Sequence, residues 1–249
     1  MLGTYALQNW PVSFPLLVAA FAGTLLVYRA DRRWWPGPED KAMYTTTPGR
    51  RVGLLAVLAL LASLPYLKPA TVGWAAVLGA LGLLYAFPLG GPDRRLKAWA
   101  SGWRKPILVA GGWALGAVVL PWVEAGMDWS SATLALLVYR FLFVLPNVVL
   151  SDRLDREGDR RAGLHTVAVR TPSWGRTAAR LSAGVAGTGA LLAGAMGWAP
   201  PLLLLDAAGP LLLLVLLLVP EPSYGGWLGW TADLVVAWPL VTFLWAWAT

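Results

Sequence analysis

Long apolar segments make up most of this sequence, and they constrain its fold more than any other feature. Eight of them are long enough, or nearly long enough, to cross a bilayer: 11–28, 52–67, 69–88, 106–123, 131–151, 181–198, 200–220 and 227–248. Only 13% of the 249 residues are charged, about half the share usual for a soluble domain. The sequence therefore predicts an integral membrane protein with a single transmembrane domain over residues 1–249.

The apolar segments are expected to be α-helices, because a helix satisfies its own backbone hydrogen bonds within lipid. A transmembrane barrel would alternate apolar and polar residues, and no such alternation is seen. The absence of Cys excludes a disulfide scaffold, and a single His argues against a His-rich zinc site. The predicted fold class is an all-α, polytopic bundle of about eight spans.

Lys and Arg are distributed unevenly among the connecting loops. Loops 29–51, 89–105, 152–180 and 221–226 share one side of an eight-span chain, and they hold all of the 20 basic residues except Lys68 and Arg140. Basic loops remain in the cytoplasm. We therefore expect these loops to be cytoplasmic and both termini to lie outside, in a bacterial-type cytoplasmic (inner) membrane. The basic residues give no indication of nucleic-acid binding.

The stretch from Asn147 to Arg170 follows the fifth segment and concentrates acidic residues. Asp152, Asp155 and Asp159 are spaced i, i+3, i+7, which places them on one face of a continued helix. Three like charges on one face are tolerated when a cation lies among them. The alternative is a solvated loop whose acidic residues pair with neighbouring arginines, which are Arg153, Arg156, Arg160 and Arg161.

A magnesium–diphosphate site accounts for this acidic pattern. Mg²⁺ prefers oxygen ligands and commonly takes one or two carboxylates together with phosphate oxygens. Such an ion, together with nearby Lys or Arg, would stabilise the charge that builds up on a departing diphosphate. A lipid tail attached to that diphosphate would lie among the helices.

The segment SDRLDREGDRRAGLHTVAVR resembles the second Asp-rich motif of the UbiA superfamily of intramembrane prenyltransferases. It matches the pattern of that family at Asp152, Asp155, Glu157, Gly158, Asp159, Arg160, Gly163, Thr166, Ala168 and Val169. The segment LYAFPLGGPDRRLKAW is similar to the Tyr-x-x-Pro turn and the following Leu-Lys of the same family, through Tyr85, Pro88, Leu96 and Lys97.

The resemblance implies a helical bundle with a central cavity, in which an isoprenoid chain is transferred from a prenyl diphosphate to an aromatic or other lipophilic acceptor. It implies Mg²⁺ as cofactor and membrane lipid as surroundings, and it leaves the oligomeric state open. Catalytic roles would go to Asp155, Asp159 and Asp31, and Asp152 would join these three as a metal ligand. The implied diphosphate contacts are Lys97, Arg29, Arg160 and Asn147.

The first loop departs from the family pattern, which usually carries a second set of carboxylates there. Only Asp31 lies near the expected place, and Trp35 follows where another carboxylate would stand. The family usually has nine helices and this sequence predicts eight; because only one predicted span precedes Asp31, we expect the first helix of the family to be the one without a counterpart. Two functions follow: an active, divergent prenyltransferase, or a catalytically impaired UbiA-like protein that serves as a lipid-binding or structural subunit.

Two charges lie within predicted spans. Arg140 near the middle of the fifth segment costs about 2.5–3.5 kcal/mol to insert, so it is expected to face the bundle interior with a partner. Asp206 in the seventh segment lies at a similar depth, and we predict an Arg140–Asp206 pair that either fixes helix packing or lines the acceptor cavity. A transporter that uses these residues and Asp233 is a third possibility. His165, the only His, is interpreted as a solvated loop residue.

Overall fold

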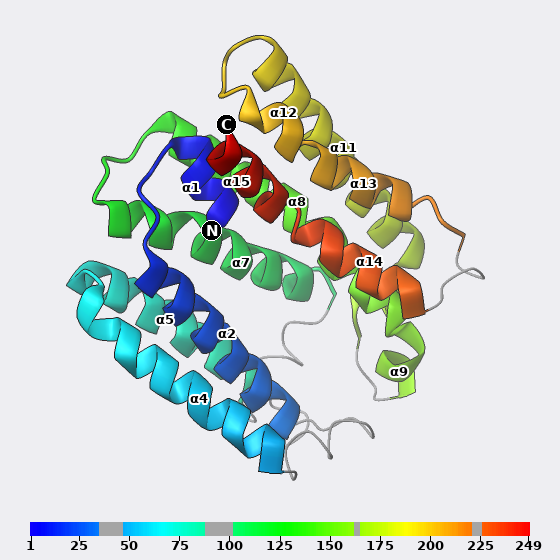
Figure 1. Cartoon of the computed structure of the whole chain (residues 1–249). Helices are drawn as coiled ribbons and strands as arrows, with labels where there is room; N and C mark the ends of the chain where they lie inside the picture. Colours follow the sequence, from blue (N-terminus) through cyan, green and yellow to red (C-terminus); the bar gives the residue numbers. More distant parts are fainter. Residues whose placement is uncertain (35–46, 88–101, 162–164, 221–225) are drawn as a thin grey trace. The chain divides into compact units, whose positions relative to one another are not determined.

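The computed structural model describes residues 1–34, 47–87, 102–161, 165–220 and 226–249 (Figure 1). Within these ranges every named element is a helix. They are α1 (Leu2–Gln8), α2 (Phe14–Trp34), α4 (Thr47–Ser63), η1 (Leu64–Tyr66), α5 (Pro69–Ala86), α7 (Arg104–Ala125), α8 (Ser131–Leu154), α9 (Arg156–Arg161), α10 (Val167–Arg170), α11 (Pro172–Ala195), α12 (Leu202–Asp206), α13 (Ala208–Leu216), α14 (Gly226–Val236) and α15 (Pro239–Ala248). The predicted all-α class is confirmed.

Several helices are long and apolar enough to cross a membrane. In the described part of the chain these are five, namely α2, α4 with η1, α5, α7 and α8, and a sixth arises if α14 and α15 count as one bent span. The protein therefore has the helices of an integral membrane protein. The predicted count of eight spans is not confirmed, because α11 and the pair α12–α13 fall outside this set.

The chain divides into two compact units. One comprises Ser13–Trp99 and Leu120–Met127, and the other comprises Met1–Val12, Ala100–Val119 and Asp128–Thr249. We call them the α2–α5 unit and the α8–α15 unit. The organisation as a single transmembrane domain stays a prediction.

In the α2–α5 unit, α2 packs against both α4 and α5. Helices α2 and α5 approach each other closely at Gly82 of α5, because a Cβ added there would lie 3.0 Å from Val27 of α2. Glu124, near the end of α7, connects the residues that precede α2 and α5. Its carboxylate accepts hydrogen bonds from the Ser13 hydroxyl at 3.4 Å and from the Lys68 backbone N–H at 3.2 Å.

The core of the α8–α15 unit lies where four helices meet. Apolar side chains of α8, α11, α13 and α14 form one buried cluster: Phe143, Val149, Leu150, Ala179, Ala183, Leu213, Leu217, Leu228, Ala232 and Val235. In Figure 1, α11 and α13 lie side by side, in agreement with their extensive contacts. Small residues of α11, among them Ala179 and Ala183, face this core, as close helix packing requires.

Two of the predicted apolar segments are broken helices. Segment 200–220 forms α12 and α13, and segment 227–248 forms α14 and α15, which meet at a 45° bend. Proline accounts for both breaks, because Pro210 and Pro239 have no N–H to donate to the carbonyl four residues earlier. For Pro210 that carbonyl belongs to Asp206, and the Tyr139 hydroxyl donates to it instead at 3.2 Å.

Candidate functional site

The Asp-rich motif begins on the last turn of α8, and its first carboxylate is buried. Asp152 is 2% exposed, and its Oδ1 accepts a hydrogen bond within an ion pair from Nζ of Lys105, on the first turn of α7. A buried carboxylate without a partner is costly, so Lys105 is what makes this position tolerable. The ammonium group of Lys105 has three donor hydrogens, and its side chain remains 21% exposed, so it can also meet a ligand.

A backbone contact holds the other end of the motif beside α7. The Gly102 N–H donates to the His165 carbonyl at 2.7 Å, and Gly102 forms an isolated parallel bridge with Thr166. The φ of Gly102 is +60°, a conformation that favours glycine. Lys105 follows three residues later, so this bridge and the Asp152 ion pair place both ends of the motif around the start of α7.

Buried oxygens in this region lack hydrogen-bond partners within the described ranges. They are Oδ2 of Asp152, Oδ1 of Asn147 and Oγ1 of Thr166. Buried polar atoms are nearly always hydrogen-bonded, so each such oxygen calls for a water, an ion or a ligand. We use the name α8-end site for these three residues together with Lys105, Asp155 and Asp159.

The predicted continuous helix through the three aspartates is wrong. α8 ends at Leu154, Asp155 caps it with ψ near 1°, and α9 begins at Arg156. Asp155 is exposed and Asp159 is half-buried, whereas Asp152 is buried. The interruption is one residue long, and the backbone N–H groups of Asp155 and Asp159 still donate to the carbonyls four residues earlier, at 3.0 and 2.8 Å.

The described residues contain no group of three or more Asp, Glu or His placed to hold a metal ion. Mg²⁺ needs fewer, since one or two carboxylates with phosphate oxygens suffice. Asp152 is close enough to Asp159 and Asp155 to be repelled by both. The donor set is therefore oxygen-rich, as Mg²⁺ requires, and the assignment of Asp155 and Asp159 to a metal stays a prediction.

The other predicted site residues are Arg29, Asp31, Lys97 and Arg160, with His165 as the remaining residue singled out in this segment. Arg29 and Asp31 belong to the α2–α5 unit, and Lys97 lies outside the described residues. Arg160 is exposed and forms an ion pair at 3.4 Å with Glu157, as the solvated alternative predicts for the arginines of this segment. His165 is exposed, in agreement with its interpretation as a solvated residue.

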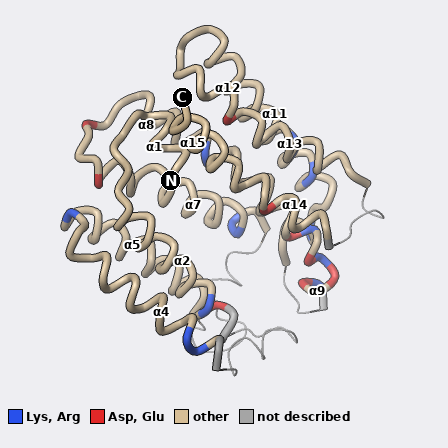
Figure 2. The backbone as a smooth tube through the Cα atoms, viewed as in Figure 1, with Lys and Arg blue, Asp and Glu red and all other residues tan. Residues whose placement is uncertain are grey.

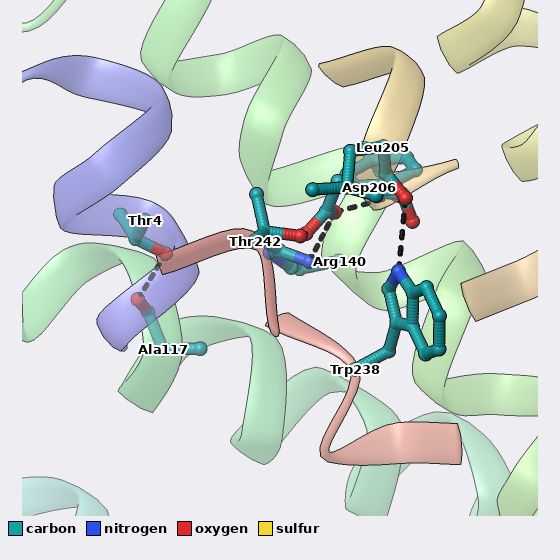
Figure 3. Close-up of polar contacts among 8 residues, drawn as sticks. Thr4, Ala117, Arg140, Leu205, Asp206, Trp238 and Thr242 are labelled. Carbon is teal, nitrogen blue, oxygen red and sulfur yellow. Dashed lines mark hydrogen bonds and ion pairs between the residues drawn. The ribbon is translucent and has the colours of Figure 1, made fainter. Parts of the chain in front are cut away.

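The predicted ion pair within the spans is confirmed. Arg140 of α8 donates to Asp206 of α12 from Nη1 at 2.7 Å and from Nη2 at 3.4 Å (Figure 3). The Tyr139 and Thr242 hydroxyls donate to the same carboxylate at 2.7 and 2.8 Å. Arg140 is 3% exposed and Asp206 is fully buried.

This network holds α12 against α15 and against the bend between α14 and α15. Thr242 belongs to α15, and Nε1 of Trp238, at the bend before α15, donates to the Leu205 carbonyl of α12 at 2.9 Å (Figure 3). Four hydrogen bonds satisfy the Asp206 carboxylate within the network. The contacts therefore favour the packing role over the cavity role. Asp233 is exposed on α14 and takes no part in the network.

Three of these residues are not predicted as site residues by the sequence. Lys105 belongs to the basic loop 89–105, and its place at the start of an apolar segment is the one signal that distinguishes it. Tyr139 and Thr242 carried no signal, because hydroxyls within an apolar helix are common and their partner lies far away in the sequence.

Comparisons with known proteins identify no relative: no family model, no curated protein and no solved structure matches this chain.

Proposed function

We propose that this protein is a Mg²⁺-dependent intramembrane prenyltransferase of the UbiA type. It transfers an isoprenoid chain from a prenyl diphosphate to an aromatic or other lipophilic acceptor. The observation that carries the proposal is the Asp-rich motif at the end of a long apolar helix, where Lys105 pairs with the buried Asp152, one oxygen of which has no partner in the described ranges. A diphosphate is bound by cations, here Lys105 and a Mg²⁺ ion that the nearby carboxylates would hold. Its isoprenoid tail would lie in the surrounding lipid.

The residues of the α8-end site divide into two roles. Asp155 and Asp159 would hold Mg²⁺, which supplies positive charge to the diphosphate when bound. Lys105 donates to diphosphate oxygens, and Asp152 positions it, a role that differs from the metal role the motif alone implies. The allylic C–O bond breaks, the diphosphate leaves, the acceptor forms the new bond to the isoprenoid carbon, and its proton passes to solvent.

The test is product formation by the purified protein with Mg²⁺, a panel of prenyl diphosphates and aromatic acceptors. Asp155→Ala and Asp159→Ala should each lower the rate about a hundredfold or more, since each removes charge stabilisation at the leaving group. Asp233→Ala is the matched control, because it removes an exposed acid of α14 outside the site, and it should retain activity.

One result would favour the alternative function. Tight binding of prenyl diphosphate without turnover on any acceptor would indicate a lipid-binding or structural subunit, a possibility consistent with the few carboxylates near Asp31 in the first loop. Absence of both binding and turnover would contradict the proposal outright.

A further inference from the structure

A groove of about 470 Å³ runs between α2 and α4 in the α2–α5 unit. We call it the α2–α4 groove. It is lined entirely by apolar residues: Leu17, Val18, Phe21, Ala22 and Leu25 from α2, and Val52, Leu55, Ala56 and Ala59 from α4. These residues recur three or four positions apart on each helix, so each helix contributes one continuous face.

The shape of this groove follows from residue size. Ala22 and Ala56 are 1% and 5% exposed and form its floor, where small side chains leave space between the helices. Phe21 and Leu55 are 74% and 63% exposed and form its walls. The groove therefore opens outward, where a lipid chain in the bilayer can enter it directly.

Basic side chains lie at one end of the groove. Arg29 follows Leu25 by four residues, and Arg51 precedes Leu55 by four, so each continues a groove-lining face of its helix. The guanidinium of Arg29 lies over Gly53 of α4, where a Cβ would be 3.1 Å from Nε. Arg50 and Arg51 are exposed, Asp31 follows Arg29 by two residues, and Figure 2 shows both blue and red at this end of α2 and α4.

We propose that the α2–α4 groove binds one acyl chain of an anionic phospholipid, with the headgroup phosphate held by Arg29 and Arg51. The wholly apolar lining suits a hydrocarbon chain. At one end Arg29, Arg50 and Arg51 outnumber Asp31, and this excess of positive charge suits a phosphate. Basic residues at a membrane surface attract anionic lipids in this way. This proposal does not depend on the proposed prenyl transfer, since it uses no residue of the α8-end site and its test substitutes Arg51, which the prenyl transfer does not use.

The test compares lipids that share acyl chains and differ in headgroup. Purified protein in detergent is titrated with palmitoyl-oleoyl phosphatidylglycerol or phosphatidylcholine, and bound lipid is counted by native mass spectrometry. We expect phosphatidylglycerol to bind in preference. Arg51→Gln should weaken its binding about fivefold, since one surface arginine is lost. Arg170→Gln, which removes an exposed arginine of the other unit, is the matched control and should leave binding unchanged.

Two further measurements separate headgroup from chain. Ala59→Phe fills the groove while leaving the arginines, so it should reduce phosphatidylglycerol binding, and a dihexanoyl lipid with the same headgroup should bind weakly to the wild type. Equal binding of both headgroups, or unchanged binding in Arg51→Gln, would overturn the proposal. Preference for a prenyl diphosphate or for inorganic phosphate over phosphatidylglycerol would also overturn it. Arg51 is exposed, so its variant folds even if the groove-filling variant does not.

Discussion

At the scale of single residues, buried charges determine which contacts the interior of the protein can make. Arg140 and Lys105 each meet a buried aspartate, yet the two pairs differ. Four hydrogen bonds satisfy the carboxylate of Asp206, whereas Asp152 keeps one oxygen without a partner in the described ranges. A closed network stabilises packing, and an incomplete one has capacity for a ligand. The contacts therefore indicate a packing role for the Arg140–Asp206 pair, and the ligand-binding role of the Lys105–Asp152 pair stays a proposal.

The Arg140–Asp206 pair is expected to be structurally essential. Asp206→Ala leaves a buried guanidinium without its carboxylate, so it should lower the free energy of unfolding by about 3–5 kcal/mol. The double variant Arg140→Met with Asp206→Asn removes both charges together and should recover at least half of this loss. Denaturant unfolding in detergent, followed by tryptophan fluorescence, measures both changes.

Asp233→Asn is the control for this prediction, because Asp233 is exposed on α14, and it should change stability by less than about 0.5 kcal/mol. A stable Asp206→Ala protein that loses only acceptor binding would instead place the pair in the acceptor cavity.

At the scale of elements, glycine positions decide how closely α11 approaches its neighbours. A Cβ on Gly187 would lie 2.5 Å from Cδ2 and 2.7 Å from Cγ of Leu211 in α13, and a Cβ on Gly194 would lie 2.8 Å from Leu204 in α12. Gly189 on the same helix has nothing within 4 Å of its Cβ position. The small residues of segment 181–198 thus serve the close packing that the sequence predicts, at particular positions only.

Alanine substitutions at Gly187 and Gly189 of α11 should therefore differ in their effect on stability. Gly187→Ala forces Leu211 to move in a packed core and should lower stability by about 1–3 kcal/mol. Gly189→Ala meets open space and should be neutral or should stabilise by up to about 1 kcal/mol, because alanine favours the helix. Thermal unfolding of the two variants in the same detergent measures the difference, and equal stability would show that α11 does not pack closely at Gly187.

At the scale of the whole molecule, the distribution of basic residues predicts how the chain crosses the membrane. The basic loops are expected in the cytoplasm, which requires α11 and the pair α12–α13 to cross as the sixth and seventh spans. Length and composition place neither among the five or six helices able to span in the described ranges. The connection between α11 and α12 therefore distinguishes an eight-span chain from a shorter count.

Cysteine labelling tests this topology, since the chain has no native Cys. A membrane-impermeant maleimide should label Asp128→Cys and Met196→Cys in intact cells, and Ser173→Cys only after permeabilisation. All three residues are exposed. Protection of Met196→Cys in intact cells would show that α11 does not cross, and labelling of Ser173→Cys would reverse the predicted orientation.

By itself the sequence determined the helical class, the location of the apolar helices and the Arg140–Asp206 pair. Apolar length and the cost of a charge in lipid are properties of a residue and its close neighbours, so they can be read without a fold. The α8-end site was predicted only in part, because its Asp-rich segment is local and its remaining partners are distant along the chain.

Only the tertiary structure decided which groups meet. It paired Lys105 with Asp152 across 47 residues, joined Gly102 to Thr166, and ended α8 before Asp155. It also placed the Tyr139 and Thr242 hydroxyls on Asp206 and opened the α2–α4 groove between two helices. Each of these depends on packing between elements, where burial forces polar groups to find partners that spacing along the chain does not reveal.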